Sequence, residues 1–165
     1  MSDLGEYLRL TDEELARIQV DHVWAWDHME DVREGEEHVE PGPADGLYYA
    51  SDMAWPLLRV LLGRAGFPVD VSRGEQRIRY ADPGEGDYGY LTADQVGVAA
   101  RGLADLPVDR LMAYVEPGDV VGAGLCPPVW DEAQALKVTR LVYGELVEYF
   151  GAAAREGHAL LVWQL

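Results

Sequence analysis

Asparagine is absent from this 165-residue chain, so N-linked glycosylation is excluded. Cysteine occurs once, at Cys126, which excludes an internal disulfide and favours a reducing compartment. The chain also lacks a run of roughly 20 apolar residues, the length that a membrane-spanning helix needs. Its first residues, MSDLGEYLRL, contain neither the basic nor the apolar segment of a signal peptide. We therefore expect a soluble cytoplasmic protein without membrane association.

Residues suited to nucleophilic catalysis are scarce as well. The only serines are Ser2, Ser51 and Ser72, and the chain has no G-x-S-x-G, S-x-x-K or H-E-x-x-H motif. Cys126 precedes two prolines, and a lone cysteine is more often a small buried apolar residue than a nucleophile. We therefore expect a binding protein rather than an enzyme, and no cofactor.

Negative charge is what the chain has in excess. The net charge is −17, and residues 1–50 contain fourteen Asp and Glu against three Arg, a net charge of −11. A surface this acidic repels nucleic acid and anionic lipid, so we expect neither as a partner. The simplest interpretation is that the acidity keeps the protein soluble. The alternative is that it attracts a basic protein partner.

Local patterns predict a helix-rich α+β fold with a few short, mainly antiparallel strands, in a single domain covering residues 1–165. Thr11 with Glu14, and Thr92 with Gln95, form capping boxes at two helix starts. Further helices are expected over 20–32, 51–66, from Pro107 onward, and over 131–155, and a surface loop over 34–45. Strands are expected over 5–10, 76–80 and 158–165, the last apolar enough to be an inner strand beside 5–10.

The segment DHVWAWDHMEDV, residues 21–32, raises the question of a metal site. His22 and His28 are six residues apart, which places them on opposed faces of a helix, whereas two helical metal ligands need a spacing of four. His28 with Asp31 could form only half of a site. We therefore predict no metal site, and a structural helix that packs Val23 and one tryptophan inward.

The segment GEGDYG, residues 84–89, matches the glycine pattern of dinucleotide-binding loops. Glu85 and Asp87 would face the pyrophosphate that such a loop cradles, and the helix cap at Thr92 lies too far along the chain. We therefore interpret it as a turn-rich loop.

Aromatic residues gather at the predicted ends of elements rather than in helix middles. They are Tyr48, Tyr49, Trp55, Tyr88, Tyr90 and Trp130. Several such rings around one cleft would form a binding surface. The simpler interpretation is that they close the ends of the core.

Five blocks of sequence, spread over nearly the whole chain, resemble the YfbM-like family of small bacterial proteins, a domain of unknown function. They are YLRLTDEEL, DMAWPLLRVLLG, YLTADQV, PVWDEAQAL and ALLVW, starting at residues 7, 52, 90, 128 and 159. The family commonly has Lys and His where this chain has Met53 and Arg59. The resemblance implies a compact α+β domain from a bacterial cytoplasm and supplies no catalytic residues.

Two functional hypotheses follow. The first is a non-enzymatic acidic protein that binds a basic protein partner, and an immunity protein bound to a toxin is an analogy of fold only. The second is a small-molecule site, enzymatic or not, where the family-like blocks converge. Its binding residues would be Asp52, Trp55, Tyr88, Tyr90 and Trp130.

Overall fold

The structure is a computed structural model that describes residues 5–51, 53–80 and 88–164. Helices are interspersed with short strands. In chain order the elements are β1 (Gly5–Leu10), α1 (Asp12–Ile18), α2 (His22–Glu37), β2 (Tyr48–Ala50), α3 (Trp55–Arg64), β3 (Gln76–Ile78), β4 (Tyr88–Leu91), α4 (Ala93–Asp105), α5 (Val108–Met112), α6 (Glu132–Arg155) and β5 (Ala159–Gln164). The prediction of a helix-rich α+β fold is confirmed.

Within the described residues, the strands form one antiparallel sheet with the order β2-β1-β5-β4-β3. The apolar strand β5 lies at the centre beside β1, as its sequence predicts, and residues 159–163 are all buried. Side chains alternate between the two faces of the sheet. Tyr7 and Val162 therefore point to one face, and Leu8 and Leu161 to the other.

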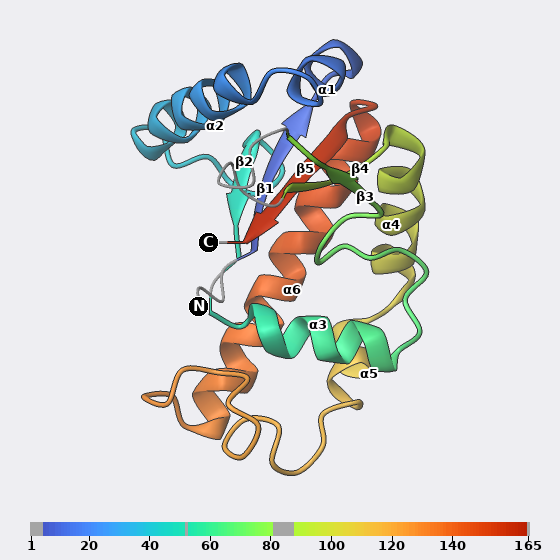
Figure 1. Cartoon of the computed structure of the whole chain (residues 1–165). Coiled ribbons are helices and arrows are strands. Elements are labelled where there is room, and N and C mark those ends of the chain that lie inside the picture. Colours follow the sequence, from blue (N-terminus) through green and yellow to red (C-terminus); the bar gives the residue numbers. More distant parts are fainter. Residues whose placement is uncertain (1–4, 52, 81–87, 165) are drawn as a thin grey trace.

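Helices cover both faces of the sheet (Figure 1). α1 and α2 supply the helical side chains of one core, among them Ile18, Ala25 and Met29, and we call this side the α2 face. α3, α4, α5 and α6 supply those of the larger core on the opposite side, the α6 face. In Figure 1 the long helix α6 runs behind the sheet, whereas α2 lies at its upper edge. The sheet is therefore the middle layer, and a residue's position along a strand decides which core it joins.

Side-chain caps explain where several helices begin. Thr11 and Thr92 each accept a hydrogen bond from the backbone amide three residues later, and both predicted capping boxes are complete. Asp131 accepts in the same way at the start of α6. Gly157, with φ of 68°, follows the end of α6 and supplies the left-handed conformation that lets the chain turn into β5. These predicted helix boundaries are confirmed.

α6 is amphipathic over its 24 residues. Leu146, Phe150 and Ala153, spaced by four and three residues, are fully buried against the α6-face core. Arg140 and Glu148 lie on the exposed side. Neither α6 nor another helix of the described chain is both long and apolar enough to cross a membrane.

α3 begins later than the sequence indicated. Ser51, one of two cap candidates beside Asp52 for the helix predicted over 51–66, is instead buried and bonded to β1. Its Oγ accepts from the Gly5 amide at 2.9 Å and donates to the Gly5 carbonyl at 3.0 Å. The helix starts at Trp55 without a side-chain cap, and Pro56 lies in its first turn, where its missing amide hydrogen is not needed. A helix beginning at Ser51 would place Pro56 one turn in, where it would bend the helix, whereas the observed start at Trp55 places it in the first turn.

The acidic segment 34–45, predicted as a surface loop, is partly helical, and the Glu36 carboxylate connects it to β2. α2 continues to Glu37, five residues beyond its predicted end. Glu36 accepts hydrogen bonds from the backbone amides of Leu47 at 2.6 Å and Tyr48 at 3.0 Å, which fixes the start of β2. β2 and β4 were not predicted, because strands of three and four residues give too little alternation to recognise.

The α6-face core buries two tyrosines completely, Tyr7 and Tyr149. The Tyr7 hydroxyl donates to the Val71 carbonyl, and the Tyr149 hydroxyl donates to the Leu47 carbonyl, both at 2.7 Å. Burial raises the pKa of both phenols well above the usual value. Both tyrosines therefore stay protonated while the protein is folded.

Raising the pH above about 10 is expected to destabilise the protein. The unfolded chain releases its tyrosine protons near that pH, whereas folded Tyr7 and Tyr149 retain theirs. Stability is therefore unaffected below about pH 10 and is lost as the pH rises toward the folded pKa, by at most about 2.7 kcal/mol per pH unit for two phenols. Urea unfolding at a series of pH values measures this, and Tyr7→Phe should reduce the slope by up to about 1.4 kcal/mol per pH unit, the contribution of one phenol. Equal stability at about pH 9 and about pH 11 would contradict the expectation.

Candidate functional site

The aromatic residues predicted to line one cleft lie on opposite faces of the sheet. Trp55 is 1% exposed and Trp130 is half-buried, and both pack against the α6-face core. Tyr88 and Tyr90 pack against the α2-face core. Asp52 lies outside the described residues. The sheet separates the two pairs of rings, so this arrangement does not supply the single cleft. A binding role for each residue separately stays a prediction.

Trp55 shows how a ring at the end of an element can belong to the core. It lies at an element end, where α3 begins, yet its ring is enclosed by β1. It meets Tyr7 edge to face, with ring centroids 5.8 Å apart and an interplanar angle of 89°. A side chain at Gly5 would collide with it, because a Cβ there would lie 2.8 Å from the indole ring. This favours the simpler interpretation, in which rings at element ends close the core.

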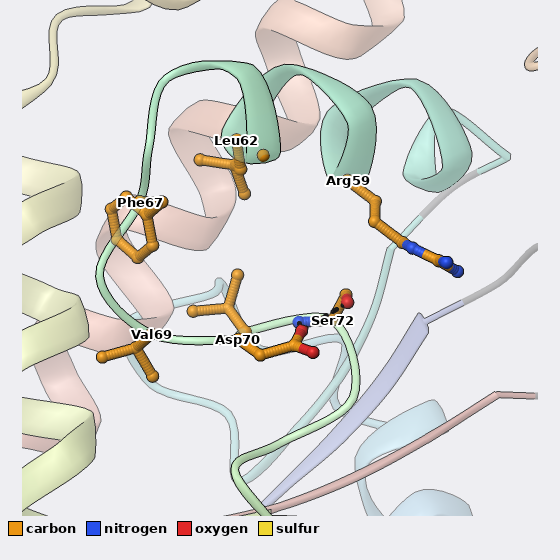
Figure 2. Close-up of a pocket in the computed structure, with 8 residues that line it drawn as sticks. Arg59, Leu62, Phe67, Val69, Asp70 and Ser72 are labelled. Atoms are coloured by element: carbon orange, nitrogen blue, oxygen red, sulfur yellow. Dashed lines mark hydrogen bonds between the residues drawn. The ribbon is translucent and has the colours of Figure 1, made fainter.

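A pocket of about 300 Å³ lies between α3 and the segment that follows it (Figure 2). Its lining residues are Arg59, Leu62, Gly63, Phe67, Val69, Asp70, Val71 and Ser72. Figure 2 shows Leu62, Phe67 and Val69 at one end, and Asp70 and Ser72 at the other. The volume is at the lower end of the range for small-molecule sites. The lining could bind a small molecule with an apolar body and one polar end.

The polar end of this pocket is shaped by an aspartate turn. The Asp70 Oδ1 accepts from the Ser72 amide at 3.0 Å, the Ser72 Oγ at 2.5 Å and the Arg73 amide at 3.1 Å. The Ser72 hydroxyl is therefore used structurally, and its residue is 5% exposed. Arg59 is the cation of the lining. Hydrophobic periodicity does not mark this site, because half of it comes from an irregular segment.

The segment 21–32 is a structural helix, as predicted, but its inward residues differ. Ala25 and Met29 are buried, whereas Val23 is 58% exposed and Trp26 is 52% exposed. The inward assignment of Val23 was therefore wrong. Trp24 is half-buried: its ring stacks on His28 with centroids 4.6 Å apart. Trp24 packs against Arg17 of α1, whose guanidinium carbon lies 4.4 Å from the ring centroid, and Trp26 is exposed, so neither tryptophan is fully buried.

His28 has a carboxylate neighbour rather than a metal-ligand set. Its Nε2 lies 2.6 Å from the Glu14 carboxylate of α1, so it joins the two helices. No group of three or more His, Cys, Asp or Glu side chains among the described residues is placed to hold a metal ion.

Cys126 and His158 also have structural surroundings. Burial raises the pKa of the Cys126 thiol, which keeps it protonated and weakly nucleophilic at neutral pH. The Arg9 Nε donates to the His158 Nδ1 at 3.1 Å. Burial and the Arg9 charge lower the pKa of His158, so it is neutral where it joins α6 to β5.

The outer surface of α2 carries a row of unpaired carboxylates. Asp27, Asp31 and Glu34, spaced by four and three residues, share one exposed side of the helix, and we call them the α2 carboxylate row. Within the described part of the chain, no ion pair neutralises them, because Arg33 is bound to Glu30 and Arg17 lies beside Asp21. The exposed apolar side chains of Val23 and Trp26 lie next to the row.

Comparisons with known proteins bear on the fold and the family. None of the curated proteins matches this chain. The chain is similar to the crystal structure of a protein of unknown function, YfbM from Escherichia coli, with a TM-score of 0.60 and 16% identity over 96% of this chain and 98% of that chain. This likeness shows a shared fold. A family model described as a domain of unknown function (DUF1877) matches residues 1–163, and the chain therefore belongs to that family, as its YfbM-like sequence blocks predicted.

Proposed function

We propose that this is a non-enzymatic binding protein whose α2 carboxylate row engages a basic protein partner. The observation that carries the proposal is the juxtaposition, on one helix, of three exposed carboxylates with exposed Trp26 and Val23. None of the three carboxylates forms an ion pair with another described residue. Carboxylates steer a basic partner and orient it, whereas a large half-exposed ring can supply the apolar anchor of the contact. Acidity that serves only solubility does not require large apolar residues beside it.

The alternative, a small-molecule site, has weaker support. Its predicted residues are divided between the two faces of the sheet, and the pocket beside α3 contains none of them. Binding of a basic partner at the α2 carboxylate row is therefore better supported than a small-molecule site.

Affinity capture from a bacterial lysate, followed by isothermal titration with the purified partner, tests the proposal. The variant Asp27→Asn/Asp31→Asn/Glu34→Gln should weaken binding of a basic protein roughly tenfold, because each exposed ion pair contributes up to about 1 kcal/mol. The loss should shrink between about 0.05 M and about 0.5 M salt, where screening removes these interactions. Trp26→Ala should weaken binding at both salt concentrations, since its contribution is apolar.

The matched control removes three exposed carboxylates elsewhere. Asp105→Asn/Glu132→Gln/Glu148→Gln makes the same change in net charge on α4 and α6. This control should bind like the wild type if the position of the charge matters. If both variants bind equally well, or if the partner is acidic, the α2 carboxylate row is not the interface.

A further inference from the structure

A carboxylate is buried beneath α2 with one oxygen unpaired. Glu6 on β1 is 3% exposed and points to the α2 face, opposite Trp163 on β5. The Tyr48 hydroxyl donates to its Oε1. Its Oε2 is buried and has no hydrogen-bond partner among the described residues. An unpaired buried carboxylate oxygen is costly, so the site is incomplete without a donor.

This oxygen borders a small cavity between α2 and the sheet. Glu6 and Trp163 form its floor, and Trp26, Met29, Glu30 and Arg33 form its α2 wall. The wall residues are spaced by three, one and three positions, the pattern of the helix side that faces the sheet. The cavity measures about 30 Å³. One water needs roughly 10–15 Å³ on this scale, so the space suits a group of water or ammonium size.

The charges around the cavity do not balance. The Arg33 Nη2 lies 2.6 Å from the Glu30 carboxylate. The Arg33 Nε is buried and, like the Glu6 Oε2, has no hydrogen-bond partner among the described residues. With Glu6 included, the lining has two carboxylates and one guanidinium, a net charge of −1. One monovalent cation would therefore balance the charge and supply the donor that Oε2 lacks.

Two tryptophan rings line this cavity, Trp26 and Trp163, and two tyrosine rings lie beside Trp163. The Trp163 ring lies 6.2 Å from Tyr48 and 6.4 Å from Tyr88 between centroids, and Trp26 forms the half-exposed outer wall. Ring faces attract cations, most strongly in a partly desolvated site. Burial and the Glu6 charge also raise the pKa of Tyr48 and Tyr88, so both phenols stay neutral and Tyr48 remains a donor to Glu6.

We propose that this cavity receives the primary ammonium group of a lysine side chain from the basic partner. The proposal rests on the proposed function and extends it, because Trp26 lines this cavity and also lies beside the α2 carboxylate row. The ammonium donates to the free oxygen of Glu6, and the lysine stem lies along the Trp26 ring. The cavity is too small for a guanidinium or a trimethylammonium group, so the site selects lysine over arginine.

Octalysine and octaarginine peptides test this selection by isothermal titration. The wild type should bind both peptides. Glu6→Gln keeps the shape of the side chain and should weaken octalysine binding at least tenfold while leaving octaarginine binding unchanged, because a hydrogen bond to a charged group is lost only with lysine. The Asp27→Asn/Asp31→Asn/Glu34→Gln variant should weaken both peptides to the same extent.

The outcomes separate the two proposals. If neither peptide binds the wild type, the proposed function fails and the lysine site fails with it. If both peptides bind and Glu6→Gln weakens both equally or neither, the proposed function stands and the lysine site is overturned.

A second measurement uses only the wild-type protein, so its result does not require a variant to fold. Butylammonium, added to ¹⁵N-labelled wild-type protein, should shift the indole resonances of Trp26 and Trp163 and leave those of Trp55 and Trp130 in place. Tetramethylammonium at the same ionic strength should shift none of them. If butylammonium leaves Trp26 and Trp163 unshifted, the cavity holds only water and the proposal is overturned.

Discussion

Replacing Gly89 by alanine is expected to destabilise the protein by more than about 3 kcal/mol. A Cβ at Gly89 would lie 1.7 Å from the carbonyl oxygen of Arg73 and 2.8 Å from its carbonyl carbon. Backbone cannot rotate away as a side chain can. β4 is also held on both sides, because Gly89 is paired with Arg77 on β3 and with Val162 on β5. Either the sheet or the segment before β3 must therefore move.

Urea unfolding followed by far-ultraviolet circular dichroism measures the loss. The matched control is Gly144→Ala on α6, where a Cβ meets no atom within 4 Å. That variant should be neutral or more stable by up to about 1 kcal/mol, because alanine favours helix over glycine. A Gly89→Ala protein with the wild-type unfolding midpoint would show that β4 does not approach the 70–75 segment this closely.

Trp55→Ala is expected to cost about 3–5 kcal/mol, the loss typical of deep aromatic truncations. The ring is 1% exposed and packs edge to face on Tyr7. Trp26→Ala should cost under about 1 kcal/mol, because this ring is 52% exposed. Both variants remove one indole, so the difference between their losses of stability reflects the position of the ring and not its chemistry. Thermal unfolding of the two proteins, with wild type as the reference, gives the comparison.

The two tryptophan variants also separate stability from binding. Trp26→Ala should fold normally and lose affinity for a basic partner, whereas Trp55→Ala should lose stability first. A Trp26 variant as unstable as the Trp55 variant would mean that Trp26 belongs to the core, and its role as a surface anchor would then be withdrawn.

Features that depend on neighbours in the chain could be predicted from sequence. The caps at Thr11, Thr92 and Asp131 satisfy amides three residues away, so the local sequence is sufficient to place them. The central position of β5 follows from the apolar run 159–163, since a strand covered on both faces favours apolar residues at successive positions. The family resemblance rests on the same kind of evidence, the order of short sequence blocks.

Features that depend on pairing across the sheet were decided only by the tertiary structure. Ser51 has the properties of a helix cap, but the approach of β1 makes it a partner of Gly5. Trp55 and Tyr90 resemble parts of one aromatic cleft, but they lie on opposite faces of the sheet. Alternation along β4 turns Tyr90 to the α2 face, whereas α3 packs Trp55 into the α6-face core. From the sequence alone, Glu6 cannot be distinguished from an exposed acidic residue, because the chain contains thirty Asp and Glu. Its burial beneath α2 comes from its register opposite Trp163, since a shift of one residue would turn it to the other face of the sheet.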